Sequence, residues 1–168
     1  MSAGRSGDPQ HQRRYIAPRR YILLLQRLAA VALELQPSPD AVVGVKRSGL
    51  FPAVYLSHQL KLPMFTDSEV RSFPFPRLSQ PLVVDTTAWG GASLRRVIAR
   101  LEKLGIANPA VLVMFSRCEP PAAVPGLRYL ELTDSIVHFW YETEKWPELG
   151  DAEAWLAGED EEERNARS

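Results

Sequence analysis

The sequence predicts an α/β domain in which helices cover both faces of a mostly parallel sheet. Short, valine-rich apolar runs bounded by turn residues recur along the chain and read as buried strands. Segments with apolar residues at three- and four-residue steps alternate with these runs, and such alternation is typical of parallel sheets with right-handed connections. The length of 168 residues suits one domain with a sizeable core.

Each expected element has its own local signal. Arg19–Leu35 has helical periodicity, and the two prolines in 36–40 end that helix. Ala41–Val45 is almost wholly apolar, which predicts a strand buried on both faces. By the same reasoning we expect helices at 50–60, 93–104 and 147–156, strands at 62–65, 82–84, 110–115 and 127–132, an exposed, mobile loop at 66–80, and an aromatic segment without a clear class at 135–146.

Composition and charge limit the function classes. Hydrophobic residues make up 45% and charged residues 24%, which is ordinary for a globular protein, and the net charge of zero gives no reason to expect nucleic acid as a partner. Basic residues crowd the start and acidic residues the end. We expect a disordered basic segment at 1–14, a domain at 15–157 and a disordered acidic tail at 158–168.

The sequence also bears on compartment and membrane. Cys118 is the only cysteine, which fits a reducing, cytoplasmic location and excludes an internal disulfide. The first residues lack the apolar core of a signal peptide, and the longest apolar stretch, 21–35, is too short and too polar to cross a membrane. The three histidines are scattered and do not have the spacing of a metal site.

The stretch from Pro81 to Leu94 is the most informative. An apolar run ends at Asp85, a turn containing Gly90 and Gly91 follows, and a helix comes next. A loop of this kind directs backbone N–H groups and the positive end of a helix at one point, which suits a phosphate. The alternative is an ordinary turn in which the two glycines merely permit tight geometry.

A second turn, Lys46–Gly49, places two cations beside a glycine at the start of a helix and could hold pyrophosphate. A basic surface turn is the alternative, and neither a Walker loop nor a dinucleotide fingerprint is present. Both turns follow expected parallel strands, whose carboxyl ends meet at the same edge of a sheet. The two turns can therefore contribute to one site.

These two stretches together resemble the type I phosphoribosyltransferases, in particular the hypoxanthine, guanine and xanthine salvage branch. Val42–Ala53 is similar to the family's pyrophosphate-loop strand, turn and helix, and Leu82–Leu94 is similar to its phosphoribosyl-diphosphate signature. The resemblance runs from about Tyr21 to Trp146. It implies a three-layer phosphoribosyltransferase-like fold with a C-terminal hood, and a flexible flap within 66–80.

The resemblance also implies roles for individual residues. Asp85 would hold the ribose hydroxyls and, through the ribose, Mg²⁺. In this family the pyrophosphate turn often contains an unusual cis peptide. The pyrophosphate would be held by Lys46, Arg47, Ser48 and Gly49, and the phosphoribosyl group by Asp85, Thr86, Thr87, Ala88, Trp89, Gly90, Gly91, Ala92 and Ser93.

The base would be bound near the end of the chain. In the resembled family an aromatic of the hood stacks on the base, which here implies Phe139, Trp140 and Trp146, with core or interface packing as the alternative. Arg117 stands where purine enzymes use a cation to contact the 6-oxo group, and Ser116 competes for that position. The implied partners are phosphoribosyl diphosphate and a purine-like base or nucleotide, and related proteins commonly form homodimers.

Two departures from the signature separate two hypotheses. The family has a second acid where this chain has Thr86, and purine enzymes often have a catalytic acid where it has Trp89. Fewer carboxylates weaken binding of hard cations, and loss of a general base typically costs about 10²–10⁴-fold in rate. The first hypothesis is a phosphoribosyltransferase, and the second is a regulatory relative that binds a nucleotide or phosphoribosyl diphosphate without catalysis. A different phosphate-handling α/β domain is the third alternative.

Overall fold

The computed structural model describes residues 13–71, 78–117 and 124–142, in two compact units. Ile22–Thr133 forms one unit, and Met1–Tyr21 with Asp134–Ser168 forms the other, so that the range 15–157 spans both. The helices and strands are β1 (Arg13–Ile16), α1 (Pro18–Leu33), β2 (Ala41–Gly44), η1 (Arg47–Gly49), α2 (Leu50–Leu60), β3 (Met64–Thr66), η2 (Glu69–Arg71), β4 (Pro81–Ala88), α3 (Ala92–Lys103), β5 (Ala110–Ser116), β6 (Leu127–Leu132) and β7 (Ile136–Phe139).

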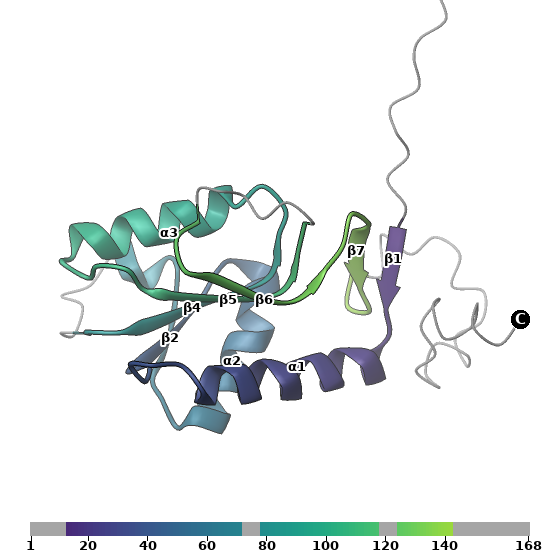
Figure 1. Cartoon of the computed structure of the whole chain (residues 1–168), viewed down its shortest axis with the longest axis horizontal. Coiled ribbons are helices and arrows are strands. Elements are labelled where there is room, and N and C mark those ends of the chain that lie inside the picture. Colours follow the sequence, from purple (N-terminus) through teal and green to yellow (C-terminus); the bar gives the residue numbers. More distant parts are fainter. Residues whose placement is uncertain (1–12, 72–77, 118–123, 143–168) are drawn as a thin grey trace, which may run out of the picture. The chain divides into compact units, whose positions relative to one another are not determined.

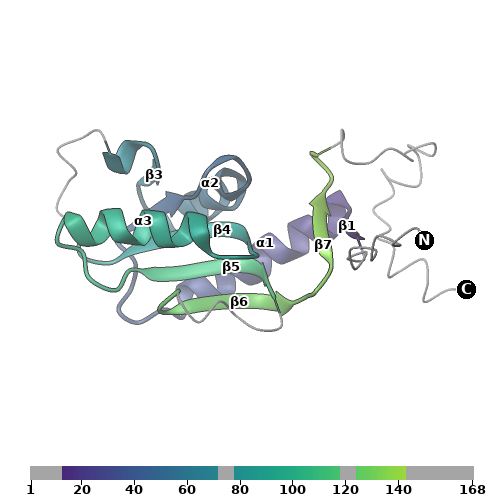
Figure 2. The same ribbon diagram turned by 90° about the horizontal axis from the view of Figure 1, so that it is seen from above.

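The larger unit is built on a five-stranded sheet in the order β3-β2-β4-β5-β6. Every neighbouring pair in this sheet is parallel, which confirms the predicted fold class. Figures 1 and 2 show α3 over one face of the sheet and α2 against the other. Helices are needed on both faces because the central strands β2, β4 and β5 are almost entirely buried.

Two packing layers hold the helices on the sheet. On the α3 side, Leu94, Val97 and Leu101 pack with valines of β2, β4 and β5 in one buried cluster. On the α2 side the approach is closer, because Gly44 of β2 has no side chain. A Cβ atom at Gly44 would lie 2.9 Å from Cβ of Ala53 and would displace the helix.

The smaller unit contains a parallel pair, β1 and β7, with Arg13 opposite Ile136 and Ile16 opposite Phe139. Arg13 and Arg14 thus belong to a strand, although the sequence placed them in the N-terminal segment. Next to this pair the Tyr21 ring meets the ring of Phe139 edge-on, with 5.5 Å between centroids. The predicted helix at 147–156 and the predicted tail at 158–168 lie outside the described residues. Of the predicted segment at 1–14, only Arg13 and Arg14 are described.

Strand β4 is longer than the sequence predicted. It was expected to end at Val84, but it pairs with β5 as far as Ala88, which lies opposite Ser116. Thr86 and Thr87 are β-branched and fit a half-buried pleated strand, and this preference outweighs the turn signal expected from a polar run. The turn before α3 is therefore shorter and begins at Trp89.

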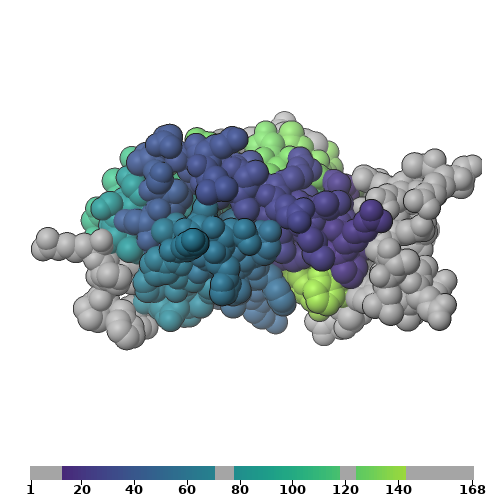
Figure 3. Space-filling view, turned by 90° about the horizontal axis from the view of Figure 1, so that it is seen from below, coloured from purple at the N-terminus to yellow at the C-terminus, as the bar shows by residue number. Residues whose placement is uncertain are grey.

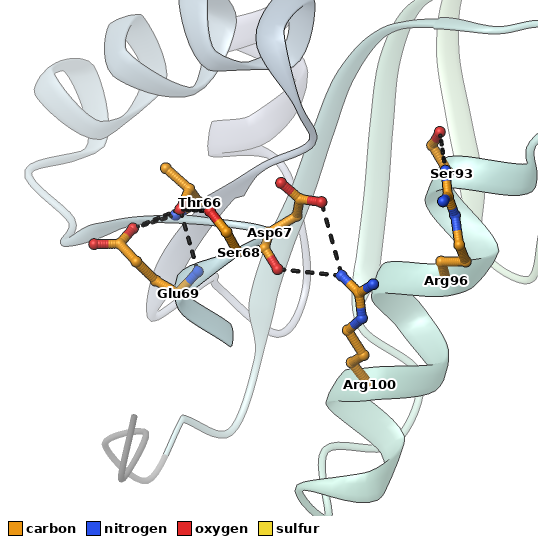
Figure 4. Close-up of polar contacts among 7 residues, drawn as sticks. All are labelled: Thr66, Asp67, Ser68, Glu69, Ser93, Arg96 and Arg100. Atoms are coloured by element: carbon orange, nitrogen blue, oxygen red, sulfur yellow. Dashed lines mark hydrogen bonds and ion pairs between the residues drawn. The ribbon is translucent and has the colours of Figure 1, made fainter. Parts of the chain in front are cut away.

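The stretch after β3 was predicted as a loop, but it starts with an ordered turn (Figure 4). The Thr66 N–H and hydroxyl donate to Oε2 of Glu69 at 2.7 and 2.8 Å, and the Glu69 N–H donates to the Thr66 hydroxyl oxygen at 3.3 Å. The hydrogen bond from the Thr66 N–H, and after it the bond from the Thr66 hydroxyl, hold the pKa of Glu69 below its ordinary value. The pattern is a capping box that starts η2; residues 72–77 lie outside the described ranges.

Within the described ranges, no helix has the length and apolar character needed to cross a lipid bilayer.

Truncation of Leu101 in α3 should destabilise the fold strongly. Its side chain is fully buried, whereas Leu104, one turn along, is 46% exposed. We expect Leu101→Ala to lower the free energy of unfolding by about 2–5 kcal/mol and Leu104→Ala to change it by less than about 0.5 kcal/mol. Urea unfolding followed by circular dichroism measures both; equal losses would contradict the assigned packing of α3.

Candidate functional site

The two predicted turns meet at the carboxyl edge of the sheet. Gly44 of β2 lies opposite Val84 of β4, and the Val45 N–H donates to the Val84 carbonyl at 2.9 Å. Just beyond this point the Ser48 hydroxyl donates to Oδ1 of Asp85 at 3.3 Å. A residue of the expected pyrophosphate turn thus touches the acid of the expected phosphoribosyl signature.

Gly49 makes this approach possible. A Cβ atom at Gly49 would lie 2.7 Å from the Val84 carbonyl oxygen, 3.1 Å from the Asp85 Cα and 3.2 Å from Asp85 Oδ1. The φ of Gly49 is −70°, so any residue could adopt its backbone conformation. Glycine is required here for space, because the corner lies directly on the β4 backbone.

Asp85 is a buried acid. It is 8% exposed, and its Oδ1 accepts hydrogen bonds from the Thr86 N–H at 2.8 Å and from Ser48. Burial raises the pKa of Asp85 to about 7; the two hydrogen bonds oppose this shift, and the charge of Asp67 adds to it. The carboxyl can therefore gain or lose its proton near neutral pH, and a cationic or hydroxyl-bearing ligand would favour its charged form.

The corner after β2 combines strain and free donors. Lys46 has φ 22° and ψ 158°, a conformation that non-glycine residues rarely adopt and that costs about 1–3 kcal/mol. The first N–H groups of a helix have no partner within it, which makes those of Lys46, Arg47 and Ser48 available to an anion. The cis peptide implied for this turn is absent: in the described ranges the one cis bond joins Gln36 to Pro37.

The turn before α3 consists of Trp89, Gly90 and Gly91. Gly91, with φ 66°, precedes the first turn of α3, so the helix N-terminus opens at this turn, and phosphate binding there stays a prediction. Thr87 and Ala88, expected within the turn, lie in β4 instead. From Asp85 to the turn the strand rises roughly 13 Å, at about 3.3 Å per residue.

Two arginines that the sequence analysis did not select border this turn. Arg95 donates to the Gly90 carbonyl at 2.9 Å, and Arg96 donates to the Ser93 hydroxyl oxygen at 3.0 Å. The α3 first turn contains no acid. The sequence could have pointed to these residues, because two consecutive arginines follow the signature directly. Two cations in that place add to the attraction of the helix N-terminus for phosphate.

Trp89 and Arg117 come together at the ends of β4 and β5. Cζ of Arg117 lies 3.9 Å from the centroid of the Trp89 ring, and both side chains are half-buried. Trp89, one of the two expected departures from the signature, thus contacts the cation that the resemblance would assign to the base. Cys118, the next residue, lies outside the described ranges.

Asp67 is a second buried acid that sequence reasoning missed. Its N–H donates to the Gly44 carbonyl at 3.0 Å, which places it across β2 from Asp85. Arg100 of α3 holds it, with Nη1 3.2 Å from the Asp67 carbonyl oxygen and 3.7 Å from Oδ2 (Figure 4). Within the described residues no group of three or more histidines, cysteines or acids could hold a metal ion.

The residues predicted to stack on a base fall in the smaller unit. Phe139 is 2% exposed and stacks on Tyr141 with 5.6 Å between ring centroids. This favours packing over base stacking for Phe139, because Tyr141 covers one face of its ring and the side chain is almost entirely buried. Trp140 is half-buried and meets Tyr141 edge-on at 5.7 Å, and Trp146 lies outside the described residues.

An apolar groove of about 830 Å³ lies along α2. Figure 3 shows the face on which α1 (purple) and α2 (blue) lie. The groove does not include Asp85 or the turn before α3, and its lining residues are Arg47, Leu50, Phe51, Val54, Tyr55 and His58.

The order of the sheet and the two turns at its carboxyl edge define a phosphoribosyltransferase-like fold. Among solved structures, a purine phosphoribosyltransferase from Pyrococcus horikoshii matches with TM-score 0.59 and 25% identity over 75% of this chain and 92% of that one. The xanthine-guanine-hypoxanthine phosphoribosyltransferase of Helicobacter pylori matches with TM-score 0.67 and 17% identity over 81% and 97%.

A hypothetical protein from Neisseria gonorrhoeae, solved with bound ppGpp, matches with TM-score 0.67 and 16% identity over 89% of this chain and 98% of that one. Orotate and adenine phosphoribosyltransferases also match, so the similarity extends across type I phosphoribosyltransferases and does not single out the purine branch. No protein-family model and no curated protein matches the sequence.

A methyl group at Gly49 should disturb the corner, whereas one at Gly90 should not. The Cβ of Gly49→Ala would meet backbone atoms of β4, but that of Gly90→Ala would meet nothing within 4 Å. We expect Gly49→Ala to lower the free energy of unfolding by about 1–3 kcal/mol and Gly90→Ala to leave it within about 0.5 kcal/mol. Thermal unfolding of both variants tests this, and an unaffected Gly49→Ala would show that the corner is not packed on Asp85.

Asp85 should make stability depend on pH. Its pKa rises from an ordinary value of 3.8 to about 7, so the folded protein keeps a proton that the unfolded chain releases between these values. Stability therefore falls as pH rises through that window, by at most about 1.4 kcal/mol per pH unit.

Asp85→Asn should flatten this part of the curve, because an amide does not titrate. Urea unfolding of wild type and variant from about pH 4 to about pH 8 isolates the contribution of Asp85 by difference. Parallel curves would mean that Asp85 is ionised in the folded protein throughout this range.

Proposed function

We propose that the chain is a phosphoribosyltransferase that transfers the 5-phosphoribosyl group from phosphoribosyl diphosphate to a purine-like base. The observation that carries this proposal is the contact between the two turns, in which Ser48 bonds Asp85. A ligand with a phosphate at one end, a pyrophosphate at the other and a ribose between them has the chemistry that this edge of the sheet offers.

Each part of the edge has a role in the proposal. The N–H groups and cations of Lys46–Gly49 bind pyrophosphate, and the turn from Trp89 to Ser93, supported by Arg95, binds the 5′-phosphate. The Asp85 carboxylate accepts the ribose hydroxyls. Release of the Asp85 proton on ligand binding costs little free energy at neutral pH, because the pKa of this carboxyl is about 7.

The transfer itself requires positioning and charge stabilisation. A ring nitrogen of the base forms a bond to C1 of the ribose while the bond from C1 to the pyrophosphate oxygen breaks, and the proton on that nitrogen passes to water. The ring gains positive charge at the transition state, and in this proposal the Asp85 carboxylate offsets that charge. Mg²⁺ fits this arrangement, since it is commonly held by one or two carboxylates with substrate oxygens, here Asp85 and the ribose hydroxyls, and it would offset phosphate charge.

A second candidate function is regulatory binding without catalysis. It is favoured by Thr86 in place of a second acid and by the contact of Trp89 with Arg117, which leaves no carboxylate in the turn. The gonococcal structure with bound ppGpp is a protein of similar fold that holds a phosphorylated guanine nucleotide. Under both candidates the partner is a small phosphorylated molecule, and a cytoplasmic homodimer remains the expectation.

Incubation with labelled phosphoribosyl diphosphate, Mg²⁺ and a panel of bases should yield a labelled nucleotide with at least one purine-like base. Saturable binding of phosphoribosyl diphosphate without product from any base would favour the regulatory candidate. Absence of both would refute the proposed site.

Asp85→Ala should abolish binding that depends on the ribose under either candidate, because it removes the one acid of the signature. Asp134→Ala changes an exposed acid of the other unit and serves as the matched control. Calorimetry with phosphoribosyl diphosphate measures the affinities, and circular dichroism confirms that both variants fold. An Asp85→Ala variant that binds as tightly as Asp134→Ala would contradict the assignment.

A further inference from the structure

The side of α2 that faces away from the sheet is apolar. The helix packs Pro52, Ala53 and Leu56 inward, where all three are buried. On the opposite side Phe51 and Val54 are 48% and 47% exposed, and both line the groove along α2. A helix that is apolar on both sides is normally covered on both, and exposed apolar surfaces of this kind mark interaction sites.

The groove has a fixed shape because α2 lies directly on β2. There is no room for even a methyl group at Gly44, since its Cβ atom would lie 2.9 Å from Cβ of Ala53 and 3.0 Å from Cδ2 of Leu50. The helix therefore cannot settle closer to the sheet and close the groove. Binding to a surface that is already formed costs less conformational entropy than binding to one that must first be ordered.

The ionisable groups around the groove are basic. Arg47 and His58 line it near the two ends of α2, and no acid is among its lining residues. Lys46 precedes Arg47, and Lys61 follows the helix directly. A partner that matches this surface combines an apolar side with acidic residues, because complementary charges steer association and suppress wrong partners.

The sequence at 146–163 has this combination. Within the predicted helix at 147–156, Leu149, Ala152 and Leu156 recur at three- and four-residue steps and would form one apolar side. The whole stretch contains eight acids and neither lysine nor arginine. The acidic end of the chain, which the phosphoribosyl site does not use, thus has the chemistry that the groove lacks.

The lengths of the groove and of this segment also agree. The eleven residues of α2 extend for about 16 Å, and the ten residues of the predicted helix at 147–156 would extend for about 15 Å. The other end of the chain does not qualify. Residues 1–12 contain neither an aromatic nor a branched aliphatic residue, so they cannot fill an apolar groove.

We propose that two copies of the chain associate by exchanging these segments, so that residues 146–163 of each copy lie in the α2 groove of the other. A net charge of zero means that two copies do not repel each other, while the acidic end of one attracts the basic groove of the other. The exchange covers both grooves in one closed, two-fold association, and its two identical contacts reinforce each other. The 26 residues after Glu142 would span roughly 85 Å when extended, which is ample for such an exchange.

Sedimentation of the full chain tests the groove. We expect wild type to form a dimer, and Val54→Asp to raise the dimer dissociation constant at least about 10-fold, because it places a charge in the apolar groove. Leu104→Asp is the matched control, since Leu104 is 46% exposed at the end of α3 and does not line the groove. Circular dichroism checks that both variants fold. A monomeric wild type, or equal effects of the two substitutions, would overturn the proposal.

Mixing two variants tests the exchange itself. Val54→Asp keeps an intact segment, and Leu156→Asp keeps an intact groove. Each variant alone should be monomeric at a concentration at which wild type is dimeric, whereas the mixture should form mixed dimers through its one intact pair, with lower affinity than wild type. Energy transfer between differently labelled variants measures this. A segment that binds the groove of its own molecule would give no mixed dimer at any concentration, and a groove covered by another surface would leave Leu156→Asp dimeric; either result refutes the exchange.

Substitution of His58 tests the charge match. At about pH 8, where an ordinary histidine is neutral, His58→Lys adds a cation to the groove and His58→Glu adds an acid. We expect the lysine to tighten the dimer and the glutamate to weaken it, each by about 2- to 5-fold. The same change in both variants would contradict an acidic occupant. These measurements do not involve ligand binding at the sheet edge, so their outcome is separate from that of the proposed function.

Discussion

The arrangement of the candidate site depends on the close approach of the corner after β2 to the backbone of β4. The approach requires a residue without a side chain at position 49, because a Cβ atom there would lie 2.7 Å from the Val84 carbonyl oxygen. It also brings the Ser48 hydroxyl to Asp85. The parallel pairing of β2 with β4 fixes the height of this corner, since Gly44 lies opposite Val84. A one-residue slip of that register would turn Asp85 to the other face of the sheet.

The same approach creates an electrostatic cost that a ligand can relieve. Burial raises the pKa of Asp85 to about 7, and Asp67, held across β2 by Arg100, adds a like charge nearby. Perturbed carboxylates of this kind are concentrated at functional sites, although structural networks also produce them. Here the strained backbone of Lys46 and the donors of the corner lie beside the acid. Strained backbone, a buried acid and helix N–H donors are each concentrated at functional sites, and here they occur within one corner.

The sequence predicts the frame of this site better than its details. Valine-rich runs identified β2, β4 and β5 because parallel strands are buried on both faces, and the bounds of α2 were predicted residue for residue. The predicted end of β4 was wrong because the β-branched Thr86 and Thr87 also fit a strand, which here continues along β5 after its pairing with β2 has ended. Asp67 and Arg100 were missed because their contact joins residues 33 apart in the sequence, which no local pattern encodes. For Phe139 the sequence left base stacking and packing open, and its burial against Tyr21 and Tyr141, which favours packing, arises from tertiary contacts that no local pattern encodes.

The turn before α3 contains Trp89 and no carboxylate, which bears on whether the chain catalyses a reaction. A general base contributes a limited factor where one is used, and transfer through a cationic transition state depends more on the alignment of the ribose with its leaving group. The groups that would provide this alignment, Asp85 and the corner at Gly49, are in contact in this chain. Beside them the Trp89 ring lies against the Arg117 guanidinium, so this part of the edge carries an aromatic side chain and a cation.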